Sequence, residues 1–290
     1  MITLNEKLEI RDCLQKYCEQ KGSQNKAANT LNGVSAATIS KLLNSEWDLI
    51  NEVMWRSIAA QIGVKQKSWN IVETRDFKTL NYIFQDAQEN AMVMAVCGDA
   101  GSGKSLTARA YSEGNRNVFL LCCNEYWNRK LFIQELLREM GKNSYGETVG
   151  EMMQTIVTEL KRIENPLIIM DEADKLSDQV MYFFITLYNQ LEDHCGIILL
   201  ATDHLEKKLK RGLRLNKKGY KEIYSRIGRK FIMLKGANVT DIADICAANG
   251  LNSKQDIKAV IDDCESDLRR VKRKVHSIHK VNSSKPENQE

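Results

Sequence analysis

Eight residues from Gly98 to Ser105 form the pattern in this chain that most directly predicts chemistry. They fit G-x-x-x-x-G-K-[ST] at every fixed position, directly after an apolar stretch. Glycines let the backbone curl so that N–H groups point at phosphate oxygens, and a following helix adds its positive end. We expect Lys104 to reach the β- and γ-phosphates of a nucleotide and the Ser105 hydroxyl to ligate Mg²⁺. The alternative is an ordinary glycine-rich turn between a strand and a helix. The predicted nucleotide contacts are Gly98, Asp99, Ala100, Gly101, Ser102, Gly103, Lys104, Ser105 and Leu106.

A second pattern is an apolar run that begins at Pro166 and ends in carboxylates. We expect Asp171 to hold Mg²⁺, usually through water, and to help bind the nucleotide. Glu172 is placed to orient and polarise the attacking water, because phosphoryl transfer depends on positioning and electrostatics. Such a run, taken alone, also fits a plain strand end; after a complete phosphate-binding loop it predicts the hydrolytic half of the site. We assign Asp174 to a helix N-cap or a supporting position, outside the chemistry.

The elements that must position these residues alternate between strands and helices. Alternation of this kind after a phosphate-binding loop predicts an α/β domain, with a mostly parallel sheet covered by helices on both faces. The nucleotide should then lie at the carboxyl edge of the sheet. We place this domain at residues 74–235. Strands are predicted at 91–97, 118–123, 166–171 and 196–201, and helices at 74–90, 106–113, 131–140, 149–164 and 178–193.

Residues 1–63 predict a separate, all-helical domain, joined by a linker at 64–73. After a helix over 4–20, the segment 23–43 indicates two helices with a tight turn at Gly33. Ser35 is expected to cap the second helix and Ile39 to pack inward. This arrangement resembles a helix-turn-helix that docks in a DNA groove; the alternative is a small helical bundle with no DNA role. The residues expected to face the groove are Ala36, Ala37, Thr38, Ser40 and Lys41.

The segment 205–221 is strongly basic, with eight lysines and arginines against the single acid Glu206. A charge run of this kind is either a solvated helix face or a set of phosphate contacts to DNA, which release counterions regardless of sequence. Lys207, Lys208 and Lys210 are the candidates for such contacts.

Three helices are predicted for a small lid at 236–281, which Thr240, Ser253 and Ser266 should cap. The last residues, 282–290, lack apolar content and are expected to be disordered.

Bulk properties limit the classes of protein to consider. The chain has 290 residues, enough for more than one domain, and a formal net charge of +4, so affinity for nucleic acid must come from local clusters. Its longest apolar runs have the length of strands, and no secretory signal is recognisable at the N-terminus. The eight cysteines form no C-x-x-C pair. We therefore expect a cytoplasmic protein with reduced cysteines and no membrane partner.

Together these features are similar to those of the AAA+ ATPases. Combined with the N-terminal helix-turn-helix and a short lid, they resemble the transposition regulators of the phage Mu protein B (MuB), TnsC and IstB type. The resemblance covers nearly the whole chain except the tail, and implies ATP as the nucleotide. The segments that carry it are 71–74, 95–105, 167–174, 196–203 and 224–227.

The resemblance implies roles for four further residues. Thr202 matches the sensor position that helps to place the water and detects the γ-phosphate. Arg226 lies where an arginine finger would reach a neighbouring subunit's nucleotide, with Arg229 as the second choice. Arg269 matches the lid position that contacts the nucleotide. The alternative for each arginine is a plain surface charge. The implied catalytic set is Lys104, Glu172, Thr202 and Arg226.

Two polar loops, 125–130 and 143–148, match the loops with which relatives face DNA inside a helical filament. The candidates there are Arg129, Lys130 and Thr148. The resemblance therefore implies an ATP-dependent, largely nonspecific DNA-binding regulator of transposition that assembles with itself on double-stranded DNA and acts on a transposase. A nucleotide-gated helix-turn-helix transcription regulator and a helicase loader are the alternatives.

Overall fold

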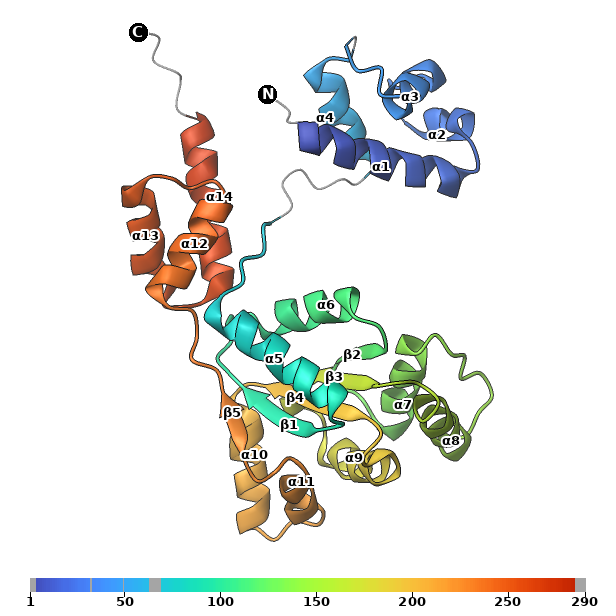
Figure 1. Cartoon of the computed structure of the whole chain (residues 1–290), viewed down its shortest axis with the longest axis vertical. Helices are drawn as coiled ribbons and strands as arrows, with labels where there is room; N and C mark the ends of the chain where they lie inside the picture. The colour runs from blue at the N-terminus through green and yellow to red at the C-terminus, as the bar shows by residue number, and fades with distance from the viewer. Residues whose placement is uncertain (1–3, 32, 49, 63–68, 285–290) are drawn as a thin grey trace. The chain divides into compact units, whose positions relative to one another are not determined.

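The computed structural model describes residues 4–31, 33–48, 50–62 and 69–284. Contacts divide the chain into two compact units, Met1–Asn70 and Ile71–Glu290. Residues 64–68, half of the predicted linker 64–73, lie outside the described residues, as do residues 63 and 285–290. The two units are treated separately below (Figure 1).

In the described part of the first unit, all regular secondary structure is helical. Its helices are α1 (Leu4–Lys21), α2 (Gln24–Thr30), α3 (Ala36–Leu43) and α4 (Glu52–Gln61). Ser35 caps α3, where its hydroxyl accepts from the backbone N–H of Thr38 at 3.1 Å. Ile39 is fully buried with Leu14, Leu42 and Trp55 in one hydrophobic core. The capping and packing follow the sequence pattern, while the assignment of α2 and α3 to DNA binding stays a prediction.

The second unit is built on a five-stranded sheet. Its strands are β1 (Val93–Cys97), β2 (Val118–Cys122), β3 (Leu167–Asp171), β4 (Gly196–Ala201) and β5 (Phe231–Met233). They pair in parallel in the order β2-β3-β4-β1-β5. Strand β4 therefore lies between β1, which leads into the phosphate-binding loop, and β3, which ends in Asp171. The residue after β4, Thr202, is placed between the two halves of the predicted site.

Helices cover both faces of this sheet because its central strands are apolar on both sides. One face packs on α5 (Arg75–Glu89) and α6 (Lys104–Gly114), around Val96, Ile169 and Leu200. The other face packs on five helices around Ile168, Met170 and other strand residues. These helices are α7 (Arg129–Glu139), α8 (Val149–Leu160), α9 (Asp178–Leu191), α10 (Asp203–Arg214) and α11 (Tyr220–Arg226).

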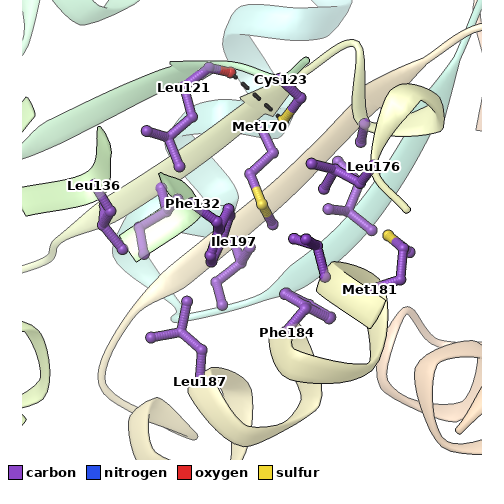
Figure 2. Packing of buried hydrophobic residues seen from close by; sticks show 14 of the residues in the cluster. Leu121, Cys123, Phe132, Leu136, Met170, Leu176, Met181, Phe184, Leu187 and Ile197 are labelled. Atoms are coloured by element: carbon purple, nitrogen blue, oxygen red, sulfur yellow. Dashed lines mark hydrogen bonds between the residues drawn. The ribbon is translucent and has the colours of Figure 1, made fainter. Parts of the chain in front are cut away.

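The packing on the second face is continuous from the strands into the helices. Figure 2 shows Met170 and Ile197 of the strands beside Phe184 and Leu187 of α9 and Phe132 of α7. Phe132, Met170 and Phe184 have no exposed surface. This dry core holds β3 and β4 at a fixed register, and the loops at their carboxyl ends inherit that rigidity.

The lid consists of α12 (Val239–Ala248), α13 (Lys254–Cys264) and α14 (Leu268–Ser284). The connection from β5 to the lid is tied to α5. The carboxylate of the buried Asp76 accepts from the backbone N–H of Gly236 at 2.7 Å, and the Arg75 guanidinium donates to the Gly236 carbonyl at 3.0 Å. The first turn of α5 thus fixes where the lid begins.

Two predicted lid caps are wrong. Asn238, not Thr240, caps α12 through a reciprocal pair of hydrogen bonds with Asp241. Ser266 has φ +63, whereas an N-cap residue lies in the extended region, and Asp267 instead accepts from the backbone N–H of Arg269 at 2.8 Å. Ser253 caps α13 as predicted.

Several predicted helix boundaries are also wrong. Helix α8 ends at Leu160 rather than 164, α6 begins at Lys104 rather than 106, and α9 ends at Leu191 rather than 193. Helix α14 continues through Ser284, so residues 282–284 of the predicted disordered tail are helical. Helix α7 begins at Arg129 rather than 131, because Asn128 caps it and accepts from the N–H of Leu131 at 3.0 Å. Arg129 and Lys130 therefore lie on a helix and not in a loop.

Two negative findings concern the described part of the chain. None of its helices combines the length and apolar character that crossing a membrane requires. All eight cysteines fall within it, and none is paired in a disulfide.

Candidate functional site

The phosphate-binding loop runs from the end of β1 to the start of α6. Gly101 and Gly103 have φ angles of +81° and +92°, which side chains disfavour, and Gly103 is the N-cap of α6. A Cβ atom at Gly101 would lie 1.9 Å from the Asp267 carboxylate of the lid. The Gly101 carbonyl also accepts from the N–H of Leu268 at 3.0 Å. The loop therefore needs its glycines both for its own curl and for the close approach of the lid.

Lys104, the first residue of α6, is folded back over this loop. Its Nζ donates to the carbonyls of Gly98 at 2.7 Å and Asp99 at 2.9 Å, and to the Ser102 hydroxyl at 3.2 Å. Burial lowers the pKa of Lys104, against the raising effect of nearby Asp171. The ammonium has only neutral hydrogen-bond partners, and an anion at this place would stabilise its charge.

Asp171, the last residue of β3, faces Ser105. Burial raises the pKa of Asp171, and a hydrogen bond from the Ser105 side chain opposes that rise. The same carboxylate accepts from the backbone N–H of Glu172 at 3.0 Å. A hydroxyl and a carboxylate in contact supply the oxygen ligands that Mg²⁺ prefers, so the pair fits the predicted metal position.

Glu172 occupies a strained backbone position beside this pair. Its φ of +56° and ψ of 37° lie in the left-handed region, which is sparsely populated for residues other than glycine. The carboxylate is about half exposed and pairs with the Lys175 ammonium at 2.6 Å. The backbone conformation directs this side chain to the sheet edge, and a single salt bridge restrains its carboxylate. The carboxylate can therefore accept a hydrogen bond from a water there.

Asp174 does not cap a helix, which was one of the two roles expected for it, and it contacts Thr202 instead. The Thr202 hydroxyl donates to the Asp174 carboxylate at 2.8 Å, across the gap between β4 and the short helix η1 (Ala173–Lys175). The same hydroxyl accepts from the N–H of His204 at 3.4 Å and so caps α10. Asp174 also lies near enough to raise the pKa of Lys104. The only sequence signal for it was an acid two positions after Glu172.

The three arginines implied by the resemblance differ in their surroundings. The Arg226 guanidinium donates to the Asn189 side chain at 2.6 and 3.0 Å and lies over the Tyr188 ring. Arg229 is exposed, with a φ of +56°. Arg269 is exposed at the start of α14, one residue after the lid's contact with Gly101. The structure thus brings Arg269 near the phosphate-binding loop, and holds Arg226 on the surface of α9.

The predicted DNA contacts of α7 and α8 divide into free and engaged side chains. Arg129 and Lys130 are exposed in the first turn of α7, where positive charge opposes the helix dipole. Thr148 caps α8, and its hydroxyl donates to Glu151 at 2.8 Å. The helix dipole does not stabilise cations at a helix N-terminus. This favours a role in binding, and not in folding, for Arg129 and Lys130.

In the basic segment, Lys207 and Lys210 are exposed and paired with Asp203 and Glu206 one turn earlier. Lys208 differs from the expectation of a solvated face. It is half-buried, and its ammonium donates to the Leu176 carbonyl and, at 3.5 Å, to that of Asp174.

In the first unit, the predicted groove face is only partly open. Lys41 and Ala37 are exposed, whereas Ala36, Thr38 and Ser40 are half-buried. The hydroxyl of Thr38 is hydrogen-bonded to that of Ser35 at 2.9 Å.

Comparison with known proteins agrees with this geometry. A family model described as an AAA domain matches residues 87–209. The chain is 26% identical over 253 residues to the ATP-dependent target DNA activator B of Escherichia phage D108, covering 84% of this chain and 80% of that protein. It is also 26% identical over 251 residues to the protein of the same name from Escherichia phage Mu, covering 83% and 79%.

Among solved structures, a chain of the S. cerevisiae Hsp104-ADP complex aligns with 96% of this chain and 64% of its own length, at 11% identity and a TM-score of 0.43. The AAA domain match and the parallel β2-β3-β4-β1-β5 sheet give residues 71–290 an α/β AAA+ P-loop fold. Residues 87–209 thus match an AAA domain, and the chain is similar, over most of its length, to the ATP-dependent target DNA activator B proteins.

Proposed function

We propose that this protein is an ATP-dependent, largely sequence-nonspecific DNA-binding ATPase that assembles on target DNA and regulates transposition. The observation that supports it most is the edge where β1, β3 and β4 end, with Lys104, the Ser105–Asp171 pair and Glu172 together. The similarity to proteins named ATP-dependent target DNA activators points to DNA and a transposase as partners.

In this proposal the residues of the chain share the work of ATP hydrolysis. Lys104 exchanges its loop carbonyls for the β- and γ-phosphates. Ser105 and Asp171 hold Mg²⁺, which would neutralise charge on the phosphates. Glu172 breaks its ion pair with Lys175, and its carboxylate then accepts a hydrogen bond from the attacking water. Thr202, oriented by Asp174, fixes the position of that water, and Arg269 contacts the nucleotide from the lid.

Assembly in this proposal depends on Arg226. To reach the nucleotide of a neighbouring subunit, its guanidinium must leave Asn189 and the Tyr188 ring. A head-to-tail contact of this kind makes a ring if it closes and a helical filament if it does not. We expect a filament on DNA that recruits or activates a transposase and disassembles after hydrolysis.

The test is the ATPase rate of the full chain with and without random-sequence duplex DNA, together with negative-stain microscopy in a slowly hydrolysed ATP analogue. The proposal expects stimulation by DNA and filaments in the same samples. Hydrolysis that ignores DNA, from particles that stay monomeric under all conditions, would overturn it.

The compact helical unit 1–70 favours a second candidate, a transcription regulator gated by nucleotide. Such a protein would read one operator through α3 in the major groove. Binding of the full chain to a single site, without ATP, would support it. Binding to any duplex that requires ATP and falls steeply with salt supports the first proposal. A helicase recovered as the partner would instead indicate a helicase loader.

A further inference from the structure

A pocket of about 690 Å³ opens beside the turn that follows β3. Its walls come from η1, the first turn of α9, helix α10 and the start of α11, so it is separate from the phosphate-binding loop. Tyr220 forms part of the wall, because its ring lies against Gly212, where a Cβ atom would be 1.9 Å from the ring. The Tyr220 hydroxyl donates to Asp178 at 2.6 Å and fixes α11 to α9.

More cations than acids line the pocket. Three acids line it, and two of them are engaged inside the protein. Asp174 accepts from Thr202, and Asp178 accepts from Tyr220 and pairs with Lys217. The third, Glu125, is exposed. The lining also holds five cations: Lys175, Lys207, Lys208, Arg211 and Lys217. Three of these cations are paired, Lys175 with Glu172, Lys207 with Asp203 and Lys217 with Asp178.

Among these cations, Arg211 has the fewest contacts inside the protein. Within the described residues its guanidinium makes no hydrogen bond or ion pair, and the residue is exposed. Guanidinium groups recognise phosphate through paired N–H donors, and such contacts to a nucleic-acid backbone do not depend on base sequence. The free donors at the pocket wall therefore match a phosphate oxyanion.

Lys208 connects this pocket to the ATPase residues. Its side chain lines the pocket, while its ammonium donates to the carbonyls of Leu176 and Asp174. Asp174 in turn accepts from Thr202 at 2.8 Å. Burial lowers the pKa of Lys208, so a phosphate arriving in the pocket would favour its charged form and draw the ammonium from the carbonyls. That movement would release the turn that carries Glu172 and Asp174.

We infer that this pocket binds a backbone phosphate of duplex DNA and that Lys208 transmits this binding to the Asp174–Thr202 contact. The inference rests on the proposed function, because it names the site through which DNA stimulates ATP hydrolysis. It also separates Lys208 from Lys207 and Lys210, which the sequence had grouped with it.

The test compares two arginines of α10. Arg211 lines the pocket, whereas Arg214, one turn later, is exposed and does not. In the full chain with saturating ATP and Mg²⁺, Arg211→Ala should raise the DNA concentration for half-maximal ATPase stimulation about tenfold. It should also reduce the salt slope of DNA affinity by about 1. Arg214→Ala should stay within about twofold of the unchanged protein in half-maximal DNA concentration.

A second variant tests the transmission. Lys208→Met should keep DNA affinity, measured by fluorescence anisotropy, within about threefold, but lose most of the ratio of DNA-stimulated to basal ATPase. Equal losses from Arg211→Ala and Arg214→Ala would overturn the pocket in favour of a diffuse basic face. Undiminished stimulation in Lys208→Met would overturn the transmission. Millimolar inorganic phosphate that stimulates the unchanged protein as DNA does would overturn the assignment to nucleic acid. An unchanged protein that ignores DNA would instead refute the proposed function itself.

Discussion

Two regions of the molecule approach the turn after β3. One is the phosphate-binding loop with Lys104, and the other is the basic helix α10 with Lys208. Each ammonium donates to two backbone carbonyls, and burial lowers the pKa of each. Their neighbours differ. Around Lys104 the binding groups belong to the backbone of a glycine loop. Around Lys208 they are long, exposed side chains, of which Lys207 and Lys210 already pair with acids.

The difference shows two ways of preparing a protein for phosphate. A main-chain loop between a buried strand and a helix has little freedom to lose, and so can fix one phosphate position closely. Exposed side chains hold no single geometry and gain affinity mainly by releasing counterions. We therefore expect changes in the first region to abolish nucleotide binding or chemistry, and changes in the second to alter the response to DNA.

The largest expected effect tests this division directly. Lys104→Ala should weaken ATP binding about 100-fold or more, because loss of one member of a buried charge pair costs about 2–5 kcal/mol. Lys208→Ala should change ATP affinity far less. Titration with a fluorescent ATP analogue measures both. Similar losses in the two variants would show that both lysines serve the nucleotide and would end the distinction.

Glu172→Gln sharpens the comparison on the nucleotide side. The amide cannot accept a proton from water, so we expect kcat to fall about 10²–10³-fold while ATP still binds and DNA complexes persist. Glu164→Gln is the matched control, since Glu164 is an exposed acid at the opposite end of β3. Steady-state phosphate release measures both. Normal hydrolysis by Glu172→Gln would show that another group activates the water.

Thr202→Val tests the junction between the two regions. Valine keeps the shape of the side chain but removes its hydrogen bond to Asp174 and the weaker one, at 3.4 Å, that it accepts from the N–H of His204. One such bond is worth about 1 kcal/mol or slightly more, so kcat should fall up to about tenfold, with the KM for ATP little changed. A change in KM alone would mean that Thr202 serves binding and not the reacting water. Pre-steady-state measurements of the hydrolysis step can separate the two.

The sequence was sufficient wherever local chemistry decides the structure. Strand β4 lies at the predicted residues, because a buried apolar run between a turn and a polar residue has one plausible form. Helix α5 (Arg75–Glu89) lies within one residue of the predicted range 74–90 at each end, because Thr74 caps it and accepts from the N–H of Phe77 at 3.2 Å. The phosphate-binding loop was readable for the same reason, since only glycine tolerates the φ angles of positions 101 and 103.

Contacts between distant segments were not readable in this way. The hydrogen bond from Thr202 to Asp174 joins residues 28 positions apart, and no periodicity marks it. Asn238 caps α12 with Asp241 as its partner, and the Asp241 carboxylate is also fixed by a hydrogen bond from the backbone N–H of Arg75, 166 positions away. The half-buried position of Lys208 could have been predicted from the sequence, because Lys208 lies on the helix face of the buried Leu205 and Gly212, apart from Lys207 and Lys210.

The smallest expected effect compares two carboxylates, one on each side of the turn after β3. Burial raises the pKa of Asp171 above its ordinary value of 3.8, so its contribution to folding is lost as pH rises through that raised pKa. Hydrogen bonds from Lys217 and Tyr220 lower the pKa of Asp178 below 3.8, so its contribution is present at neutral pH and is lost as pH falls through the lowered value.

Without Mg²⁺ and nucleotide at pH 7, Asp171→Asn should therefore raise the melting temperature by about 2–4 °C, the change expected for roughly 1 kcal/mol in a domain of this size. Asp178→Asn should lower it by less, because that side chain is half exposed and solvent screens its partners. The gain in Asp171→Asn should shrink as pH falls toward 4. Thermal denaturation between pH 4 and 7.5 measures both. If both substitutions lower the melting temperature, Asp171 stabilises the fold as Asp178 does. The idea that the Asp171 carboxylate lowers the stability of the metal-free protein and is kept as a Mg²⁺ ligand would then be wrong.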